Sequence, residues 1–204
     1  QKEARALALA GDVDALVSLV ANQRLKGVPL AQAFDKVVTP AMADIGESWA
    51  QGRLSPAQEH VASNTVIDML ARVRPLVERT AKADRGRALC ACLGDEHHDI
   101  GVRMVGLILA AEGYRTAMVG ANVPAGDLAL MIAGDPPAIL ALSASVHANP
   151  DTLRGDLGIV ASAASAARTR VIVGGEGFRK LAALPAQVKR YESLDDLVAV
   201  AQKP

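Results

Sequence analysis

Aromatic residues are scarce in this chain of 204 residues: Phe, Trp and Tyr together make up 2% of it, and there is one tryptophan. Few aromatic rings leave few surfaces on which exposed nucleobases could stack. Basic and acidic residues number 22 each, so the formal net charge is zero. Because nucleic-acid binding usually needs a basic face, this balance argues against a DNA-binding domain within these residues.

Cysteine is also rare, with Cys90 and Cys92 alternating in one apolar run. On a strand they share a face, where they are too few for a metal cage and badly placed to bridge each other. We interpret them as buried, reduced thiols of a cytoplasmic protein. The sequence has no apolar run of membrane-spanning length and no secretory signal, and we expect no membrane association. The start, QKEARALALAGD, lacks Met and reads as mid-helix, as in a piece cut from a longer protein.

The first 80 residues repeat apolar positions at helical spacing. Breaks are predicted at Gly11-Asp12, at Gly27 with Pro29, and from Gly52 to Pro56. The last of these helices has a well-marked start, because Ser55 is suited to be its N-cap and Gln58 completes a capping box. The pattern predicts a four-helix bundle, with residues 29–51 split at Pro40.

From residue 86 the hydrophobic period changes to short apolar runs separated by helical stretches. Strands are expected over residues 87–94, 115–121, 137–145 and 170–175, and helices from near Ile100, Pro124, Asp151 and Leu194. This alternation predicts a parallel, Rossmann-like or flavodoxin-like α/β fold after the all-α part. We expect a helical domain over residues 1–82 and an α/β domain over 86–204, divided by the charged linker Lys82-Ala83-Asp84-Arg85. Ligands of such sheets bind at the carboxyl ends of the strands.

The loop after the first predicted strand reads GDEHHDIG and contains the pattern E-x-H-x-x-G, formed by Glu96, His98 and Gly101. A loop histidine taken alone is more often a hydrogen-bonded surface group than a metal ligand. Two further features stand at the same sheet edge: Ser143 closes the third strand, and Gly174-Gly175 closes the fourth.

Together these residues resemble the cobalamin-binding domain, whose pattern is D-x-H-x-x-G, then S-x-L, then G-G. The resemblance covers about residues 86–204 and implies that a neutral His98 is the lower cobalt ligand, with Glu96 on its other nitrogen. It further implies that Ser143 and the two glycines line a slot for the cofactor's nucleotide tail. The alternative is that the glycines form a plain turn and the serine caps locally. This chain departs from the pattern at Glu96 and at Ser145, the third position of S-x-L.

A second motif lies in the helical part, where Trp49, Glu59 and His60 form W-x9-E-H. It resembles the cap of cobalamin-dependent photoreceptors of the CarH type, in which these residues cover the upper face of adenosylcobalamin. The predicted capping brings all three to one end of the bundle. A core tryptophan and a solvated helix start are the alternatives.

One departure concerns the residue after the tryptophan, which in the CarH type is typically a histidine that takes the upper cobalt site after illumination. Here it is Ala50, which cannot be a ligand. The lit state would therefore carry water, hydroxide or another histidine on cobalt, with His60 and His147 as the candidates. His147 is alternatively a surface residue or a contact to the corrin edge.

The two motifs predict an adenosylcobalamin-binding light sensor, either the sensory module of a transcriptional regulator or a stand-alone sensor. It would signal through a partner or through a homo-oligomer that changes with light. No independent catalytic constellation is present, so we interpret the chain as a binding and signalling module and not an enzyme. The main alternative is a corrinoid carrier of a methyltransferase system, which W-x9-E-H disfavours and Ala50 favours. A flavodoxin-like domain with another ligand has less support, because no P-loop or dinucleotide fingerprint is present.

Overall fold

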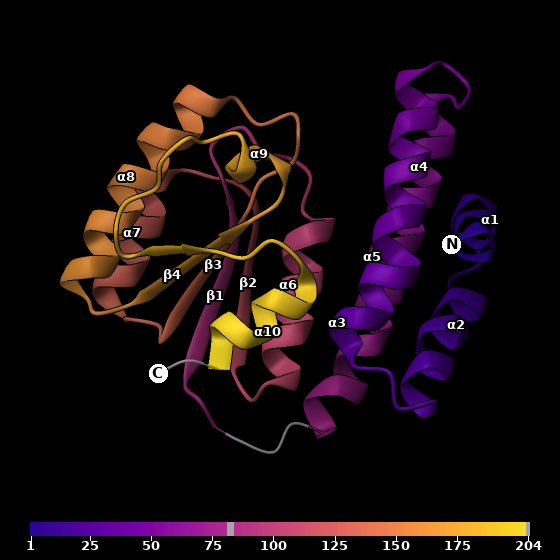
Figure 1. Cartoon of the computed structure of the whole chain (residues 1–204), viewed down its shortest axis with the longest axis horizontal. Helices are drawn as coiled ribbons and strands as arrows, with labels where there is room; N and C mark the ends of the chain where they lie inside the picture. The colour runs from indigo at the N-terminus through magenta and orange to yellow at the C-terminus, as the bar shows by residue number, and fades with distance from the viewer. Residues whose placement is uncertain (81–83, 203–204) are drawn as a thin grey trace. The chain divides into compact units, whose positions relative to one another are not determined.

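The computed structural model describes residues 1–80 and 84–202, and the chain divides into two compact units (Figure 1). We call residues 1–80 the helical unit and residues 84–202 the α/β unit, and each is described by itself. Lys82 and Ala83 of the predicted linker lie outside the described residues. Among the described helices, none combines the length and hydrophobicity that a membrane span requires.

The helical unit consists of helices that bury one apolar face each. Its elements are α1 (Lys2–Ala10), α2 (Val13–Leu25), α3 (Leu30–Ala33), the π-helical turn η1 (Phe34–Val38), α4 (Thr39–Ala50) and α5 (Pro56–Thr80). The break after α1 is confirmed, since Gly11 has a left-handed φ of 74°. Asp12 then caps α2 by accepting a hydrogen bond from the backbone N–H of Ala15 at 3.0 Å.

The predicted split at Pro40 is wrong in detail, because the chain stays helical from Leu30 to Ala50. Pro40 has no N–H to donate to the carbonyl four residues earlier, and η1 directly precedes α4. A π-helical turn changes the hydrogen-bond register at this point while the helix continues. The region 1–80 therefore contains four successive helical segments, separated at the other three predicted breaks.

The capping box at the start of α5 is confirmed. The Ser55 hydroxyl accepts a hydrogen bond from the Gln58 N–H at 3.3 Å, and the Gln58 side chain accepts one from the Ser55 N–H at 2.9 Å. The preceding loop is tied back to α4, since the N–H groups of Arg53 and Leu54 both donate to the Ser48 carbonyl. The end of α4 and the start of α5 thus lie at the same end of the helical unit (Figure 1).

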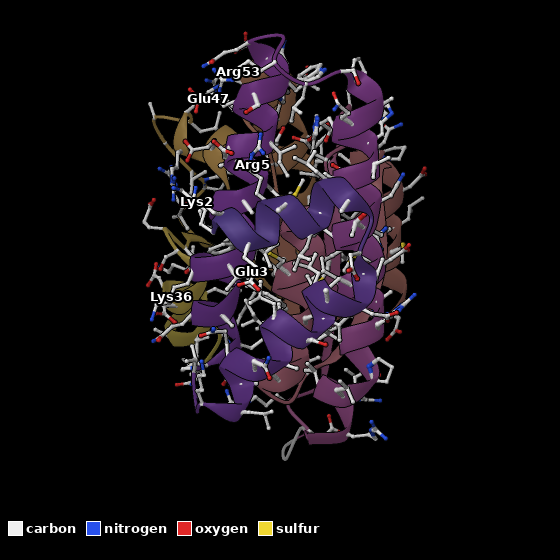
Figure 2. The ribbon with its side chains drawn as sticks, turned by 90° about the vertical axis from the view of Figure 1, so that its right-hand side faces the viewer. Lys2, Glu3, Arg5, Lys36, Glu47 and Arg53 are labelled. Carbon is white, nitrogen blue, oxygen red and sulfur yellow. The ribbon has the colours of Figure 1, made fainter. Side chains whose placement is uncertain are left out.

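Charged side chains line the outer side of α1 and α4, among them Lys2, Glu3, Arg5 and Glu47 (Figure 2). Arg5 of α1 forms an ion pair with Asp44 of α4. On the inner side, α1 buries small alanines one helical turn apart, Ala4 and Ala8. Small residues allow close approach of neighbouring helices, so α1 can lie flat against α4 and α5.

The α/β unit is a five-stranded parallel sheet with strand order β2-β1-β3-β4-β5. Its elements are β1 (Arg87–Leu93), α6 (Ile100–Ala111), β2 (Arg115–Val123), α7 (Ala125–Gly134), β3 (Ile139–Ser143), α8 (Pro150–Ala166), β4 (Arg170–Gly174), α9 (Glu176–Arg179), β5 (Val188–Arg190) and α10 (Leu194–Gln202). Helices α7 and α8 cover one face of the sheet, and α6 and α10 cover the other (Figure 1). The four predicted strands and the four predicted helix starts are confirmed, whereas β5 and α9 were not predicted.

Both faces of the central strands are buried, as expected for a sheet between two helical layers. Ser143 of β3 pairs with Gly174 of β4, and Ala91 of β1 pairs with Leu142. One residue further along, Cys92 therefore lies beside Ser143. We call Cys92, Ser143 and Gly174 the carboxyl-end row; it faces the α6 and α10 side of the sheet.

Candidate cofactor site

The loop between β1 and α6 is anchored so that Glu96 points into the protein. The Glu96 N–H donates to the carbonyl of Leu93 at 3.3 Å, and the Glu96 carbonyl accepts from the N–H of Asn122 at 2.8 Å. The whole Glu96 residue is only 3% exposed. An acid so deeply buried needs partners, and the loop supplies them.

Glu96 holds His98 by two contacts to one carboxylate oxygen. Its Oε1 accepts a hydrogen bond from the His98 backbone N–H at 2.8 Å and lies 2.7 Å from the imidazole Nδ1. The carboxylate assigns the proton to Nδ1, which leaves the lone pair on Nε2. The His98 side chain is 60% exposed, and no described residue hydrogen-bonds its Nε2. His98 is therefore oriented and free to bind a metal.

The carboxyl of Glu96 is charged in the folded protein. Burial raises its pKa, but hydrogen bonds from His98 and Ser145 outweigh this effect and hold the pKa below the ordinary value of 4.5. The backbone N–H of Ser145 is one of these donors, at 2.6 Å from Oε2. A charged carboxylate is the stronger acceptor for the Nδ1 proton and increases the basicity of Nε2.

The loop after β3 completes this arrangement. The Ser145 hydroxyl lies 3.3 Å from His98 Nδ1 and accepts the N–H of His147 at 3.2 Å. The His147 ring stacks on the His98 ring, with centroids 5.0 Å apart and an angle of 30° between the planes. His147 is therefore a neighbour of His98, which sequence reasoning did not foresee. The sequence did offer a signal for Ser145, because it is a polar residue at the third position of S-x-L, where the cobalamin-binding pattern has leucine.

Gly101 lets the start of α6 approach the end of β3. A Cβ atom at this position would lie 2.9 Å from the Ser143 hydroxyl oxygen. Ser143 itself is 8% exposed. The third residue of E-x-H-x-x-G is thus a packing glycine in this structure, and it brings the His98 loop close to the carboxyl-end row.

The two glycines after β4 are required by two different contacts. A Cβ on Gly174 would lie 2.1 Å from the ring of Tyr191, and a Cβ on Gly175 would lie 2.3 Å from the carbonyl oxygen of Ala144. Gly175 also has a φ of 94°, which favours glycine. These are closer approaches than a plain turn requires. Tyr191, 5% exposed, was missed by sequence reasoning because it follows the unpredicted strand β5.

Cys92 is a buried neighbour of the loop. Burial, reinforced by the charges of Glu96 and Asp99, raises the pKa of its thiol to about 12. Cys90 and Cys92 are both buried, and neither is in a disulfide, as predicted. The thiol of Cys92 lies 3.7 Å from the His98 carbonyl oxygen, so it supports the backbone of the loop.

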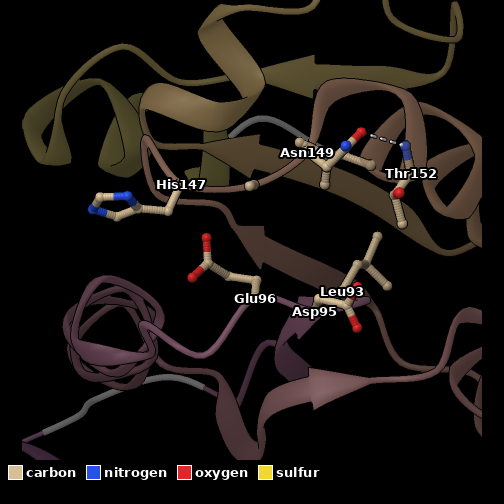
Figure 3. A pocket seen from close by; sticks show the side chains of 8 residues that line it. Leu93, Asp95, Glu96, His147, Asn149 and Thr152 are labelled. Carbon is tan, nitrogen blue, oxygen red and sulfur yellow. Dashed lines mark hydrogen bonds between the residues drawn. The ribbon is translucent and has the colours of Figure 1, made fainter.

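A pocket opens between the loops that follow β1 and β3 (Figure 3). It is lined by Leu93, Asp95, Glu96, His147, Ala148, Asn149, Thr152 and Leu153. Asn149 caps α8 here by accepting the N–H of Thr152 at 3.2 Å. The pocket thus places polar groups directly beside the Glu96–His98 pair.

Two residues of W-x9-E-H, Trp49 and His60, are exposed at one end of the helical unit, and Glu59 is half-buried. Trp49 is 41% exposed and is not a core tryptophan. The Glu59 carboxylate accepts a hydrogen bond from the Ser63 hydroxyl and lies 3.7 Å from His60 Nε2. The His60 side chain is 73% exposed. An aromatic surface and an imidazole are therefore available to a ligand at this end.

The α/β unit is thus a parallel sheet that presents an exposed histidine, held by a buried carboxylate, at its carboxyl edge. The chain belongs to the B12 binding domain family, whose model matches residues 86–199, and a second B12 binding domain model matches residues 1–74. It is a cobalamin-binding protein.

Two curated relatives come from Myxococcus xanthus. The HTH-type transcriptional repressor CarH is 34% identical over 127 residues, covering 62% of this chain and 42% of the relative. The HTH-type transcriptional repressor CarA is 32% identical over 169 residues, covering 81% of this chain and 55% of the relative. The chain thus spans about half the length of these relatives. The solved structure of a Methanosarcina barkeri monomethylamine corrinoid protein shares the fold, with a TM-score of 0.72 at 18% identity over 98% of this chain and 95% of that one.

The residues present fit a cobalt corrinoid. Imidazole nitrogen is a good ligand for cobalt, and His98 offers Nε2 with its other nitrogen already hydrogen-bonded. The absence of a side chain at Gly101 lets the loop approach the Ser143 hydroxyl, and the absence of one at Gly174 leaves a space that the Tyr191 ring occupies. No group of three or more His, Cys, Asp or Glu residues among the described residues forms a metal cage of its own. A single protein ligand is what a metal already held in a macrocycle requires.

Proposed function

We propose that this chain is an adenosylcobalamin-binding light sensor. The observation that carries the cobalamin part is the Glu96–His98 pair, which presents Nε2 to solvent at the carboxyl edge of the sheet. The sensor part is supported by W-x9-E-H on an exposed end of the helical unit and by similarity to two transcriptional repressors. When bound, adenosylcobalamin would supply a light-sensitive cobalt–carbon bond.

On the lower side, His98 would bind cobalt through Nε2 while Glu96 keeps the proton on Nδ1. Ser145 holds the second oxygen of Glu96, so the carboxylate cannot rotate without losing a hydrogen bond. The polar pocket beside this pair, with Asp95, Asn149 and Thr152, would receive amide side chains of the corrin ring. Ser143, Gly174 and Gly175 would line the slot for the nucleotide tail.

On the upper side, we propose that Trp49 packs against the adenosyl group, with Glu59 and His60 close to it. These residues remain on the bundle when the adenosyl group leaves, so loss of their ligand would favour a different arrangement of the chain. Such a change is the physical basis for a light-dependent homo-oligomer or partner contact.

The upper ligand after illumination would be water, hydroxide or His60, because Ala50 cannot bind cobalt. His147 is disfavoured, since its ring stacks on His98 and would share the lower side of the corrin. His60 carries an exposed ring and only a long contact to Glu59. It can therefore turn toward a new partner at little cost.

The alternative is a corrinoid carrier for methyl transfer, and Ala50 is the observation that favours it. A carrier leaves the upper face of cobalt open to other proteins. A sensor instead keeps a bulky adenosyl group covered, which requires an aromatic residue such as Trp49.

The experiment is to load the purified chain with adenosylcobalamin in darkness, record its visible spectrum and elution volume, and repeat both after green light. A dark spectrum that changes with light, with a changed elution volume or loss of partner binding, is the expected result. Equal affinity for methyl- and adenosylcobalamin, with no effect of light on assembly or on partner binding, would contradict the sensor and favour the carrier.

A further inference from the structure

Tyr191 occupies space beside Gly174 that the proposed binding mode gives to the nucleotide tail. Its ring lies directly on Gly174, since a Cβ there would meet three ring carbons at 2.1 to 2.7 Å. The residue is 5% exposed, so the ring is enclosed by protein. No planar base can lie between Gly174 and this ring while the ring stays in place.

The ring covers the carboxyl-end row from the α6 and α10 side. Burial raises the pKa of Tyr191, and the nearby thiols of Cys90 and Cys92 on the same face of the sheet raise it further. Ser143 stands next to Gly174 through the pairing of β3 with β4. The Tyr191 ring therefore borders the residues that the tail would contact.

The backbone of Tyr191 is fixed, whereas its side chain is held by packing. The Tyr191 N–H donates to the Val173 carbonyl at 3.0 Å, which ties the residue to the end of β4. The following residue, Glu192, is also tied, because its N–H donates to the Asp196 carboxylate at 3.0 Å. Rotation of the ring about its own side-chain bonds is thus the simplest way to vacate the space over Gly174.

We propose that Tyr191 closes the nucleotide-tail slot in the cofactor-free protein and rotates out when the tail enters. The inference rests on the proposed tail slot and goes beyond it, because it makes Tyr191 the residue that distinguishes complete cobalamin from corrinoids without a tail. The closed ring excludes water from the slot, and it lowers the apparent affinity of the protein for a cofactor that carries the tail. The minor state of a two-state protein is typically about 0.1–10% populated. If only that state binds, the apparent affinity is its own affinity multiplied by that population.

The chain is well suited to a direct test, since it has two tyrosines. Tyr114 is buried at the opposite edge of the sheet, where its hydroxyl donates to the Ala201 carbonyl at 2.9 Å, and it acts as an internal reference. The protein is labelled with fluorotyrosine and studied by fluorine NMR, with the two signals assigned through Tyr191→Phe. It is then titrated in darkness with adenosylcobalamin or with cobinamide, which lacks the nucleotide tail.

We expect adenosylcobalamin to move the Tyr191 signal to a solvent-accessible position and to leave Tyr114 buried, while cobinamide moves neither. A Tyr191 signal that stays protected in the saturated protein would overturn the proposal, and so would equal displacement by cobinamide. The visible spectrum of the same sample reports cofactor binding and light response separately. A failed light response with a displaced Tyr191 would therefore contradict the sensor and leave this inference standing.

Variants give a second, independent result. Tyr191→Ala removes the ring and should tighten apparent binding of adenosylcobalamin by about 10-fold or more, following the population argument. It should leave cobinamide affinity unchanged. Tyr191→Phe keeps the ring and should bind both as the parent protein does. Weaker adenosylcobalamin binding by a folded Tyr191→Ala protein would show that the ring is a fixed wall, and would overturn the proposal.

Discussion

The two candidate contact regions for the cofactor differ in how far the chain itself arranges them. At the end of β1, Glu96 is buried and accepts three hydrogen bonds, two from His98 and one from Ser145. At the end of α4 and the start of α5, Trp49 and His60 are exposed and have few partners. The α/β unit fixes His98 by its own hydrogen bonds, whereas the bundle offers surfaces that a ligand must order.

This difference has a functional consequence. A metal ligand set by a hydrogen-bond network loses little entropy on binding and keeps one geometry. Exposed side chains pay for their order when the ligand binds and release it when the ligand leaves. The proposed signal therefore belongs to the bundle, and the proposed anchor belongs to the α/β unit.

The largest effect is expected from His98→Ala, which removes the proposed cobalt ligand. We expect the loss of affinity to exceed the ~10–100-fold that is typical when a hydrogen-bond partner of a metal ligand is removed. Equilibrium binding of adenosylcobalamin measures it, with His97→Ala as the matched control. Unchanged affinity and an unchanged spectrum of the bound cofactor would contradict the assignment of His98.

Glu96→Gln should have the next largest effect, because an amide is a weaker acceptor for the Nδ1 proton. We expect cobalamin affinity to fall about 10–100-fold. Asp127, an exposed acid in the first turn of α7 and outside the pocket, provides the control, Asp127→Asn, which should bind nearly normally. Equal losses in the two variants would mean that Glu96 acts only through net charge.

The stability that the Glu96 carboxylate contributes should depend on pH, and Glu96→Gln serves as the reference. The pKa of Glu96 is lower in the folded protein than the ordinary 4.5, so the ionised carboxylate stabilises the folded state. This contribution is fully present above pH 4.5 and is lost as the pH falls through the lowered pKa. Chemical denaturation of the cofactor-free protein should show a stability gap between the parent and Glu96→Gln that narrows in acid; a gap that widens in acid would contradict the hydrogen-bond network.

Trp49→Ala tests the bundle side and should be milder for corrinoid binding itself. We expect reduced preference for adenosyl- over methylcobalamin, with nearly unchanged affinity for the latter. Because the side chain is partly exposed, the fold should tolerate the change. Val61→Ala, another exposed apolar position on the bundle, is the control. Equal weakening for both cobalamins would indicate a general structural role for Trp49.

A smaller effect, confined to the lit state, is expected from His60→Ala. If His60 takes the upper cobalt site after illumination, the variant should bind adenosylcobalamin normally in darkness and show a different spectrum after light. Identical lit spectra would leave water or hydroxide as the upper ligand.

The smallest effect concerns the thiols under the loop. The pKa of Cys92 is raised to about 12, chiefly by burial, so very little thiolate exists at neutral pH. We expect iodoacetamide to leave Cys92 unmodified at pH 8 in the folded protein and to alkylate it in denaturant. Rapid alkylation of the folded chain, read by mass spectrometry, would show that the loop opens readily.

Local chemistry explains which features were predictable from sequence. Ser55 and Gln58 mark a helix start by their own hydrogen bonds, and the strands follow from apolar runs. The contact of Glu96 with His98 was also expected, because E-x-H-x-x-G resembles the cobalamin-binding pattern and only His97 separates the two residues. Short-range patterns of this kind are visible in the sequence.

Long-range contacts were not predictable. Tyr191, which reaches Gly174, directly follows a three-residue strand in a segment without an apolar run. His147 stacks on His98 only because two parallel strands end at the same edge. At Pro40 the proline rule predicted a break, but a π-helical turn accommodated the residue. Each of these depends on tertiary packing, which a single sequence does not encode locally.

The most direct test of the account is the origin of the nitrogen below cobalt. The protein is prepared with all its nitrogen as ¹⁵N, loaded with unlabelled cobalamin, and reduced to the paramagnetic Co(II) state for electron paramagnetic resonance. If His98 Nε2 is the lower ligand, each cobalt line should split into a doublet, and His98→Ala should lose that doublet. A triplet from ¹⁴N in the labelled protein would show that the cofactor's own benzimidazole is still bound, and would contradict the central claim.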